Sequence, residues 1–243
     1  MDEKITTNYN VEVFNRDVIN YGGYFYTTNV RLCSRLATQR TTDAVLQMGR
    51  FAGRSVLDMA CGDGFYTIRF WDYGRPYAMV AVDAAHRAVE VANTHKQNRP
   101  IRFVVGDVHR LPWKDNSFDT VLIQSILHHD NDPVSIIHEA FRLAPEILIH
   151  EPNGNNFGVK IIEKLSRYHR EHHEKSYTSF QLKRYVKEAG GKVVYQKFAG
   201  FVPMFCPDWL AHTMKTVEPV VEGIPLLNTY GCSVVILVAV RLT

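Results

Sequence analysis

The sequence predicts a doubly wound α/β fold, in which a mostly parallel sheet carries helices on both faces. From residue 54 onward, short apolar runs rich in Val and Ile alternate with stretches of helical periodicity, which is the rhythm of repeated βαβ units. One of these runs leads directly into a turn of small residues and a helix start, as at the ligand site of such folds. The expected strands are residues 55–59, 78–82, 101–105, 118–123, 147–150, 192–197 and 232–241.

The first 50 residues are expected to form a helical cap ahead of the first strand. After an aromatic segment at 21–26, Thr42 is expected to N-cap a helix that buries Val45, Leu46 and Met48. No repeat, low-complexity tract or linker divides the rest of the chain. We therefore expect residues 51–243 to form one domain.

Two segments of that domain fall outside the alternating pattern. Residues 157–173 have the periodicity of an amphipathic helix inserted after the fifth strand, and we expect covering helices over 157–190 at the sheet's carboxyl edge. Residues 199–230 form a variable region on the substrate side. The apolar face of the inserted helix consists of Ile161, Ile162, Leu165 and Tyr168.

Composition narrows the class of protein. With 243 residues, 46% of them hydrophobic, the chain can bury a sizeable core. Its longest apolar run, 234–240, is far shorter than the roughly 20 residues of a membrane-spanning helix. The formal charge of +3 is spread without blocks of like charge, and the four cysteines lack CxxC spacing. We expect a soluble cytoplasmic protein with no nucleic-acid or membrane partner and no metal.

The most informative stretch is residues 56–67, which predicts a buried strand, a tight turn and a helix start. Its small residues let the backbone approach a ligand closely, and the helix N-terminus offers free N–H groups to an anion. Asp83 ends the next strand 21 residues after Gly62, where an acid can hold ribose hydroxyls. Both a dinucleotide site and an S-adenosylmethionine site are built in this way.

The residues around the turn favour S-adenosylmethionine. Thr67 stands where a dinucleotide motif has its third glycine. Asp58 and Asp63 bracket the turn, and two carboxylates would repel a pyrophosphate. They suit a ligand that carries an ammonium and a sulfonium, whose single carboxylate can still take the helix N-terminus.

Residues 50–195 resemble the class I S-adenosylmethionine-dependent methyltransferases, particularly the type 11 small-molecule group. The segment 58–64 is similar to that family's glycine-rich first motif, and 118–129 is similar to its fourth motif. The resemblance implies a Rossmann-like sheet of seven strands with the last antiparallel, and S-adenosyl-L-methionine as the cofactor. It also implies that Asp83 binds the ribose and Asp107 the adenine amino group. The expected cofactor-binding residues are Tyr26, Asp58, Ala60, Cys61, Gly62, Asp63, Gly64, Asp83, Ala84, Asp107, Val108, Gln124 and Ser125.

Two departures from related patterns are informative. Ala60 replaces a glycine common in the family, and we expect the turn to accommodate it if its backbone torsions are ordinary. No Asn/Asp-Pro-Pro-aromatic tetrad is present, and Cys206-Pro207 is the reverse of a Pro-Cys pair. Methylation of nucleobases is therefore disfavoured.

His128, His129 and Glu151 are the candidate catalytic residues. The two histidines follow the fourth strand, where a ligand of a doubly wound fold is expected, and imidazole suits proton transfer at neutral pH. Either ring could instead pack on the cofactor. Glu151 ends the fifth strand and could orient the acceptor, or it could bond neighbouring backbone N–H groups.

Three further groups of residues have open roles. A histidine and basic cluster on the covering helix favours an acidic acceptor if it faces inward, and is otherwise solvated charge. The aromatic segment before the first strand could cover the cofactor, and apolar residues of the variable region could line a substrate pocket, or both could be plain core. The histidine and basic cluster consists of His169, Arg170, His172 and His173, with Arg167 and Lys175 nearby. The aromatic segment contributes Tyr21, Tyr24, Phe25 and Tyr26. The apolar residues of the variable region are Phe201, Met204, Phe205, Trp209 and Met214.

The expected reaction is direct transfer of a sulfonium methyl group to a small-molecule nucleophile, with oxygen favoured over carbon or nitrogen. Holding the acceptor in line with the methyl group would supply most of the catalysis. The alternatives are a protein or RNA methyltransferase, an NAD(P)-dependent oxidoreductase and a module that binds the cofactor without turnover.

Overall fold

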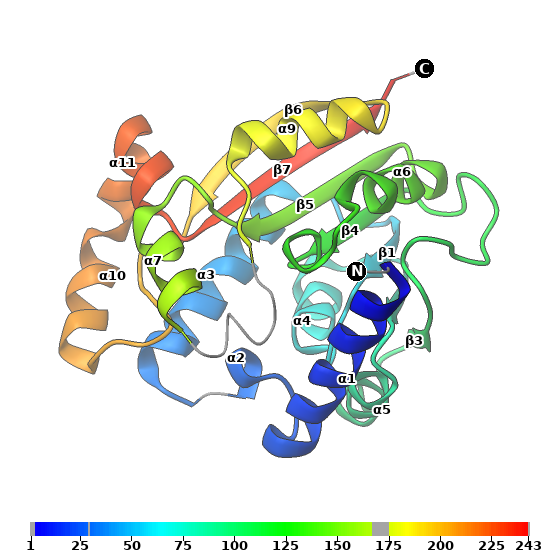
Figure 1. Cartoon of the computed structure of the whole chain (residues 1–243), viewed down its shortest axis with the longest axis horizontal. Coiled ribbons are helices and arrows are strands. Elements are labelled where there is room, and N and C mark those ends of the chain that lie inside the picture. Colours follow the sequence, from blue (N-terminus) through cyan, green and yellow to red (C-terminus); the bar gives the residue numbers. More distant parts are fainter. Residues whose placement is uncertain (1–2, 29, 167–174, 243) are drawn as a thin grey trace.

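The computed structural model describes residues 3–28, 30–166 and 175–242, with side chains from residue 11 onward except that of residue 25, and it contains a seven-stranded sheet between layers of helices (Figure 1). The strand order is β3-β2-β1-β4-β5-β7-β6. The strands are β1 (Ser55–Met59), β2 (Ala78–Asp83), β3 (Ile101–Val105), β4 (Thr120–Gln124), β5 (Glu146–Pro152), β6 (Gly191–Ala199) and β7 (Val234–Arg241).

Strand directions in the sheet match the expectation. β1 to β5 pair in parallel, whereas β7 is antiparallel to both β5 and β6. The chain order reverses between β1 and β4, and a crevice forms at the carboxyl ends of strands on either side of such a reversal. The functional site is therefore expected at the carboxyl ends of β1 and β4.

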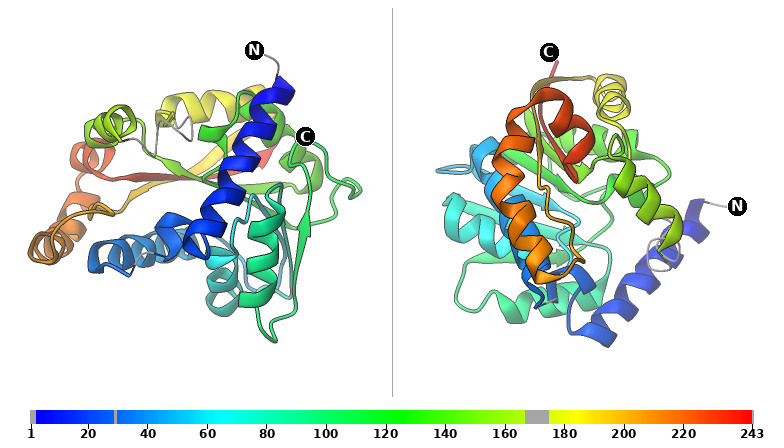
Figure 2. Two further views of the ribbon diagram at one scale, coloured as in Figure 1. Left: turned by 60° about the horizontal axis from the view of Figure 1, so that its bottom comes forward. Right: turned by 90° about the vertical axis from the view of Figure 1, so that its left-hand side faces the viewer.

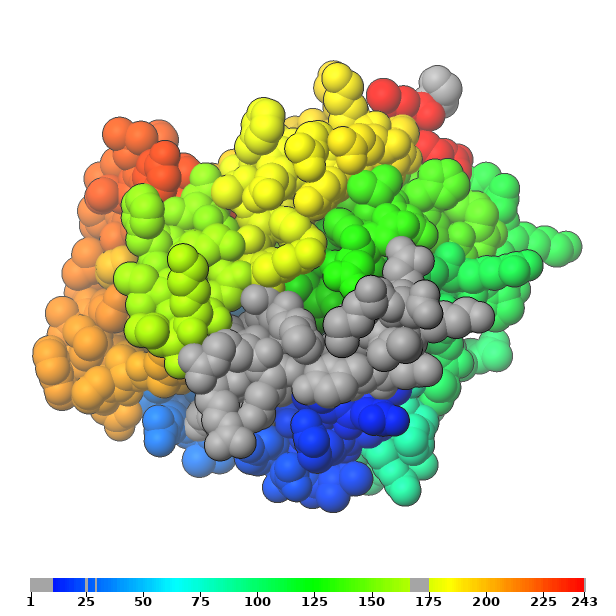
Figure 3. All heavy atoms as spheres, viewed as in Figure 1, coloured from blue at the N-terminus to red at the C-terminus, as the bar shows by residue number. Residues whose placement is uncertain are grey.

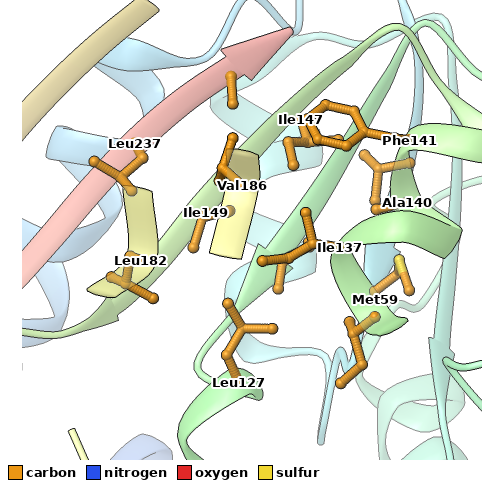
Figure 4. Packing of buried hydrophobic residues seen from close by; sticks show 14 of the residues in the cluster. Met59, Leu127, Ile137, Ala140, Phe141, Ile147, Ile149, Leu182, Val186 and Leu237 are labelled. Atoms are coloured by element: carbon orange, nitrogen blue, oxygen red, sulfur yellow. The ribbon is translucent and has the colours of Figure 1, made fainter. Parts of the chain in front are cut away.

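Helices cover both faces of the sheet because the central strands β1, β4 and β5 are buried on both faces. α3 (Leu32–Met48), α4 (Phe65–Gly74) and α5 (His86–His95) pack on one face, and α6 (Pro133–Leu143) and α9 (Ser179–Glu188) on the other. Figure 4 shows the core on the face covered by α6 and α9, where side chains of these two helices meet those of β5 and β7.

The N-terminal helices α1 (Glu3–Tyr21) and α2 (Phe25–Thr28) precede the long helix α3, and α1 packs against α5 (Figure 2). The prediction that Thr42 caps a helix was wrong. Thr42 is buried inside α3, and its hydroxyl donates to the Thr38 carbonyl at 2.9 Å. Since a threonine can satisfy its hydroxyl within a helix in this way, packing against the sheet outweighed the capping preference.

Three helices extend beyond the alternating core: α7 (Phe157–Leu165), α10 (Asp208–Gly223) and α11 (Pro225–Gly231). α7 forms part of the surface in Figure 3 and ends at Leu165, and residues 167–173 of the predicted helix lie outside the described residues. Its expected apolar face is split: Ile162 lines a cavity, whereas the side chains of Ile161 and Leu165 are 56% and 73% exposed. Tyr168 lies outside the described residues. None of the helices described is long and apolar enough to cross a membrane.

Candidate active site

A cavity of about 1120 Å³ opens at the carboxyl ends of the central strands. Its walls come from the β1–α4 turn, the ends of β2, β4 and β5, the segment around α2, α7, and the connection from β6 to α10. All but one of the expected cofactor residues line it. These are Tyr26, Asp58, Ala60, Cys61, Gly62, Asp63, Asp83, Ala84, Asp107, Val108, Gln124 and Ser125.

Gly64 is the exception, since it does not line the cavity. Its position requires a glycine because of backbone conformation and packing. It adopts a φ of +77° as the N-cap of α4, a conformation that glycine reaches without steric cost. A Cβ atom there would lie 2.9 Å from the Cβ of Ala92 and 3.0 Å from the ring of Phe103. Gly64 therefore brings α4 close to α5 and β3.

Ala60 corrects an expectation about the turn. Its φ is +61°, in the left-handed region, so its torsions are not ordinary for an L-residue. Such a conformation costs an alanine on the order of 1–2 kcal/mol. The methyl group is therefore accommodated at the cost of backbone strain.

Asp58 is a buried carboxylate with one oxygen unpaired. Thr67 donates a hydrogen bond of 2.5 Å to Oδ2, whereas Oδ1 is buried and has no partner among the described residues. Burial raises the pKa of Asp58 to about 7. A bound ammonium group would supply the missing donor and favour the ionised form, so the site fits the amino-acid end of S-adenosylmethionine.

Asp63 and Asp83 both hold backbone in place. The carboxylate of Asp63 accepts from the amide of Tyr24 at 2.9 Å, from the hydroxyl of Thr27, and from the amide of Phe65 at 3.1 Å. Asp83 accepts from the amides of Gly62 and Ala85, both at 2.8 Å, and burial raises its pKa. An ionised carboxylate has about four acceptor positions, so Asp83 can accept from ribose hydroxyls as well.

The cavity lining is acidic in the part of the chain that the structure describes. Its residues there include carboxylates but no lysine or arginine. Such a wall attracts a cationic ligand, as a sulfonium with an ammonium is, and repels a pyrophosphate. The lining carboxylates are Asp58, Asp63, Asp83, Asp107, Asp130, Asp132 and Glu163.

His128 lines the cavity and is held from behind by Glu151. The Glu151 carboxylate is fully buried, does not line the cavity, and lies 2.6 Å from Nδ1 of His128. Its other oxygen accepts from the amides of Ile126 and Leu127 at 3.0 and 2.9 Å. Burial raises the pKa of Glu151 to about 7. Glu151 can therefore act on an acceptor only through His128.

His129 also lines the cavity. Its ring centroid lies 3.9 Å from that of His128 and 5.1 Å from that of Phe14 of α1, with which it makes a T-shaped contact. The two candidate bases are thus adjacent, and α1 packs against one of them.

The residues whose roles the sequence left open fall into three sets: some line the cavity, some are exposed, and some lie outside the described residues. Phe201, Met204, Phe205 and Met214 line the cavity, whereas Trp209 does not and is 70% exposed. Tyr24 lines the cavity, Tyr21 is exposed at the surface, and the side chain of Phe25 lies outside the described residues. The histidine and basic cluster lies outside them too, except for the exposed Lys175. The unplaced members are Arg167, His169, Arg170, His172 and His173.

His150 is a cavity residue that sequence reasoning missed. It lies on β5, is 4% exposed, and its Nδ1 is 3.3 Å from the hydroxyl of Ser125. Burial lowers its pKa to about 4, so the ring is neutral at physiological pH. The alternation of strand residues could have indicated it, because residues two apart share a face and His150 therefore lies on the same face of β5 as Leu148.

Known proteins match both the sequence and the fold. Residues 57–146 match the family model described as "Methyltransferase domain". A demethylmenaquinone methyltransferase of Renibacterium salmoninarum is 36% identical over 97 residues, which are 40% of this chain and 39% of that protein. The chain spans about two fifths of the length of the curated relatives that it matches.

Two solved structures are similar over almost the whole chain. A SAM-dependent methyltransferase from Thermotoga maritima superposes with a TM-score of 0.72 at 19% identity, covering 96% of this chain and 100% of that one. The magnesium protoporphyrin IX methyltransferase from Synechocystis, solved with bound S-adenosylhomocysteine (SAH), superposes with a TM-score of 0.66 at 18% identity, covering 99% and 100%. At these identities the superpositions show a common fold.

Together these matches confirm that residues 57–146 resemble a methyltransferase domain in sequence. The superpositions confirm the predicted fold class.

Proposed function

Because residues 57–146 match the family model of a methyltransferase domain, we propose that this protein transfers the methyl group of S-adenosylmethionine to a nucleophilic atom of a small molecule. The observation that carries the proposal is the unpaired, buried Oδ1 of Asp58 in a cavity lined by carboxylates. Such an atom is costly unless a ligand pairs with it. An ammonium group is the ligand that it fits best.

The residues around the turn hold the cofactor. Asp58 binds the ammonium, and Asp83 binds the ribose hydroxyls. The carboxylate is bound by the first turn of α4, beyond the amide of Phe65, which donates to Asp63. Asp107, with Val108, contacts the adenine. When bound, S-adenosylmethionine supplies an electrophilic methyl group on a sulfonium.

The described part of the N-terminal segment, from α1 to α3, covers this half of the cavity. Tyr24 and Tyr26 line it from the region of α2, and aromatic faces can stack on adenine or attract a sulfonium. Asp63 fixes the position of this segment through the amide of Tyr24.

The end of β4 and the turn that follows it carry the catalytic groups. Gln124 and Ser125 line the cavity beside the 3₁₀ turn η1 (Leu127–His129). His128 or His129 accepts the proton of an acceptor hydroxyl or amine, and Glu151 orients His128 through Nδ1. An oxygen acceptor is favoured because a hydroxyl needs a base to become a good nucleophile, whereas a neutral amine can attack through its lone pair before it loses a proton.

A small-molecule acceptor has the best support. Two of the similar proteins carry names of small-molecule methyltransferases, acting on demethylmenaquinone and on magnesium protoporphyrin IX. Nothing among the described lining residues provides the cationic surface that an acidic acceptor or RNA would need. A protein acceptor and a module without turnover are the outcomes that the experiment below separates.

Methyl-labelled S-adenosylmethionine tests the proposal directly. The protein is incubated with a cell extract that has been divided by ultrafiltration into small molecules and macromolecules, with Asp58→Asn as the control variant. Label that appears in the small-molecule fraction, and that is lost with the variant, supports the proposal. Label confined to protein or RNA contradicts the small-molecule acceptor, and binding without any labelled product identifies a module without turnover.

A further inference from the structure

The acceptor half of the cavity is bounded by an apolar wall. We call its residues the acceptor wall; they lie on α7, on the connection from β6 to α10, and on α10 itself. Figure 1 shows α7 and α10 on the side of β6 and β7, away from β3 at the other edge of the sheet. The acceptor wall consists of Ile162, Phe201, Val202, Met204, Phe205 and Met214.

Three buried side-chain nitrogen or oxygen atoms of the described residues have no hydrogen-bond partner, and all three belong to residues that line this cavity. They are Oδ1 of Asp58, Oε1 of Gln124 and Nε2 of His150. A buried polar group without a partner costs on the order of 1–3 kcal/mol. Their concentration in one cavity indicates a site built for ligand atoms rather than scattered packing defects.

The register of the sheet places these three residues on one face. Gln124 pairs with His150 across β4 and β5, and Asp58 pairs with Leu122, two residues before Gln124. Paired residues of parallel strands share a face, as do residues two apart. The unpaired atoms therefore follow one another across the ends of β1, β4 and β5.

His150 is the member of this row nearest the acceptor wall. β7 follows β5 in the sheet, and His150 pairs there with Ile236. Val234, two residues away on the same face, lines the cavity. His150 thus lies between the cofactor residues of β1 and β4 and the apolar residues beyond β7.

We propose that Nε2 of His150 binds an oxygen atom of an apolar acceptor whose carbon skeleton packs against the acceptor wall. This inference rests on the proposed function, because it assigns the acceptor side of the same site. Asp58 and Gln124 face the cofactor, so the remaining unpaired atom belongs to the acceptor. His150 is a binding and specificity residue in this account, distinct from the candidate bases His128 and His129.

The neutral ring of His150 suits an uncharged partner. One ring nitrogen is engaged by the hydroxyl of Ser125, so the tautomer chosen there decides whether Nε2 donates or accepts. If Nε2 donates, it can bind a hydroxyl, a carbonyl or another neutral oxygen; if Nε2 accepts, it can bind only a hydroxyl. A purely apolar molecule would leave Nε2 unpaired.

Equilibrium dialysis of the SAH-loaded protein against three matched probes tests this inference. The probes are 2-naphthol, 2-methoxynaphthalene and naphthalene, which share an apolar skeleton and differ in their oxygen group. We expect the protein to bind 2-naphthol about tenfold more tightly than naphthalene, the effect of about 1.4 kcal/mol from one hydrogen bond. 2-Methoxynaphthalene, which can only accept, shows whether Nε2 carries the hydrogen.

Two variants of His150 distinguish the roles of its two ring nitrogen atoms. In His150→Asn the side-chain amide can keep the contact with Ser125 but has no atom at the place of Nε2, whereas in His150→Gln the longer side chain reaches that place. We expect the preference for 2-naphthol to be lost in His150→Asn and retained in His150→Gln, with SAH affinity unchanged in both. An unchanged preference in His150→Asn, equal binding of all three probes, or binding of none of them would overturn the inference.

A measurement on the unmodified protein guards against a variant that fails to fold. With histidine labelled by ¹⁵N, the Nε2 signal of His150 should shift on addition of 2-naphthol to the SAH-loaded protein and stay unchanged with naphthalene. The spectrum of His150→Gln assigns the signal. A signal that does not respond contradicts the inference alone, whereas failure of the protein to bind SAH contradicts the proposed function.

Discussion

The carboxylate of Asp63 accepts a hydrogen bond of 2.9 Å from the backbone amide of Tyr24, a residue 39 positions earlier in the chain. The same carboxylate accepts from the hydroxyl of Thr27. Gly62 makes the contact close, because a Cβ atom there would collide with the ring of Tyr24. The glycine turn and the N-terminal segment are therefore built as one unit.

Removal of this carboxylate should release the segment from the turn. Hydrogen bonds to a charged group contribute about 1.5–3 kcal/mol each, so in Asp63→Ala we expect amide exchange at residues 24–28 to accelerate about tenfold or more. Hydrogen exchange followed by mass spectrometry measures it. Asp72→Ala, which removes an exposed pair with Arg99, is the matched control. Equal exchange rates in the two variants would show that Asp63 does not hold the segment.

Replacement of Ala60 by glycine should stabilise the protein. Ala60 has a φ of +61°, and glycine reaches that region without the steric cost of a Cβ atom. We expect the free energy of unfolding to rise by about 1 kcal/mol, and the melting temperature by about 2–4 °C. Calorimetric melting of Ala60→Gly measures this. A lower melting temperature would mean that the methyl group makes contacts worth more than the strain.

The affinity for SAH should depend on pH through Asp58. Burial raises the pKa of Asp58 from 3.8 to about 7, so the ligand-free protein holds a proton there below neutral pH. That proton must leave when the ammonium binds, and the affinity should fall by up to about tenfold per unit as the pH drops from 7 to 5. Asp58→Asn should bind weakly and show no such dependence. A pH-independent affinity of the wild type would contradict the pairing of Asp58 with the ammonium.

The raised pKa of Asp58 has the opposite effect on the stability of the ligand-free protein, which gains from the bound proton at low pH. Because the folded pKa of Asp58 lies above the unfolded one, its proton stabilises the fold fully below about pH 4, and this contribution is lost as the pH rises toward 7. Unfolding by urea at pH 4.5 and 7 should therefore show a larger difference in the wild type than in Asp58→Asn. SAH restores the stability that is lost at pH 7.

The substitution Glu151→Gln should reverse the tautomer of His128. The new carboxamide oxygen can still accept from the amides of Ile126 and Leu127, but the NH₂ group must then donate to Nδ1 of His128, where Glu151 now lies at 2.6 Å. With the proton moved to Nε2, His128 can no longer accept one there. If His128 is the base, methyl transfer should slow by about a hundredfold or more while SAH affinity is kept. ¹⁵N spectra of the histidines report the tautomer, and an unchanged rate with a reversed tautomer would exclude His128 as the base.

Much of the fold could be predicted because it depends on local apolar runs. The first and third strands begin and end where the sequence predicts, at Ser55–Met59 and Ile101–Val105. The fifth strand runs further than its apolar residues do, since Glu151 and Pro152 pair with Val235 and Val234 of β7. A pairing with a strand more than 80 residues away leaves no signal in the local sequence.

The site could be predicted less completely for the same reason. Its turn residues are adjacent in sequence and were found together, but the contact between His128 and Glu151 depends on the register of two strands. The left-handed backbone of Ala60 follows from the geometry of the turn rather than from its residue type. His150 required knowing which face of β5 meets the cavity.

Calorimetric titration of S-adenosylmethionine, SAH and NADH into the wild type and Asp58→Asn tests the central claim most directly. Saturable binding of the first two ligands, weakened in the variant, with no heat from NADH, is the result that this account predicts. Binding of NADH without binding of S-adenosylmethionine would contradict it and identify the glycine turn as a dinucleotide site.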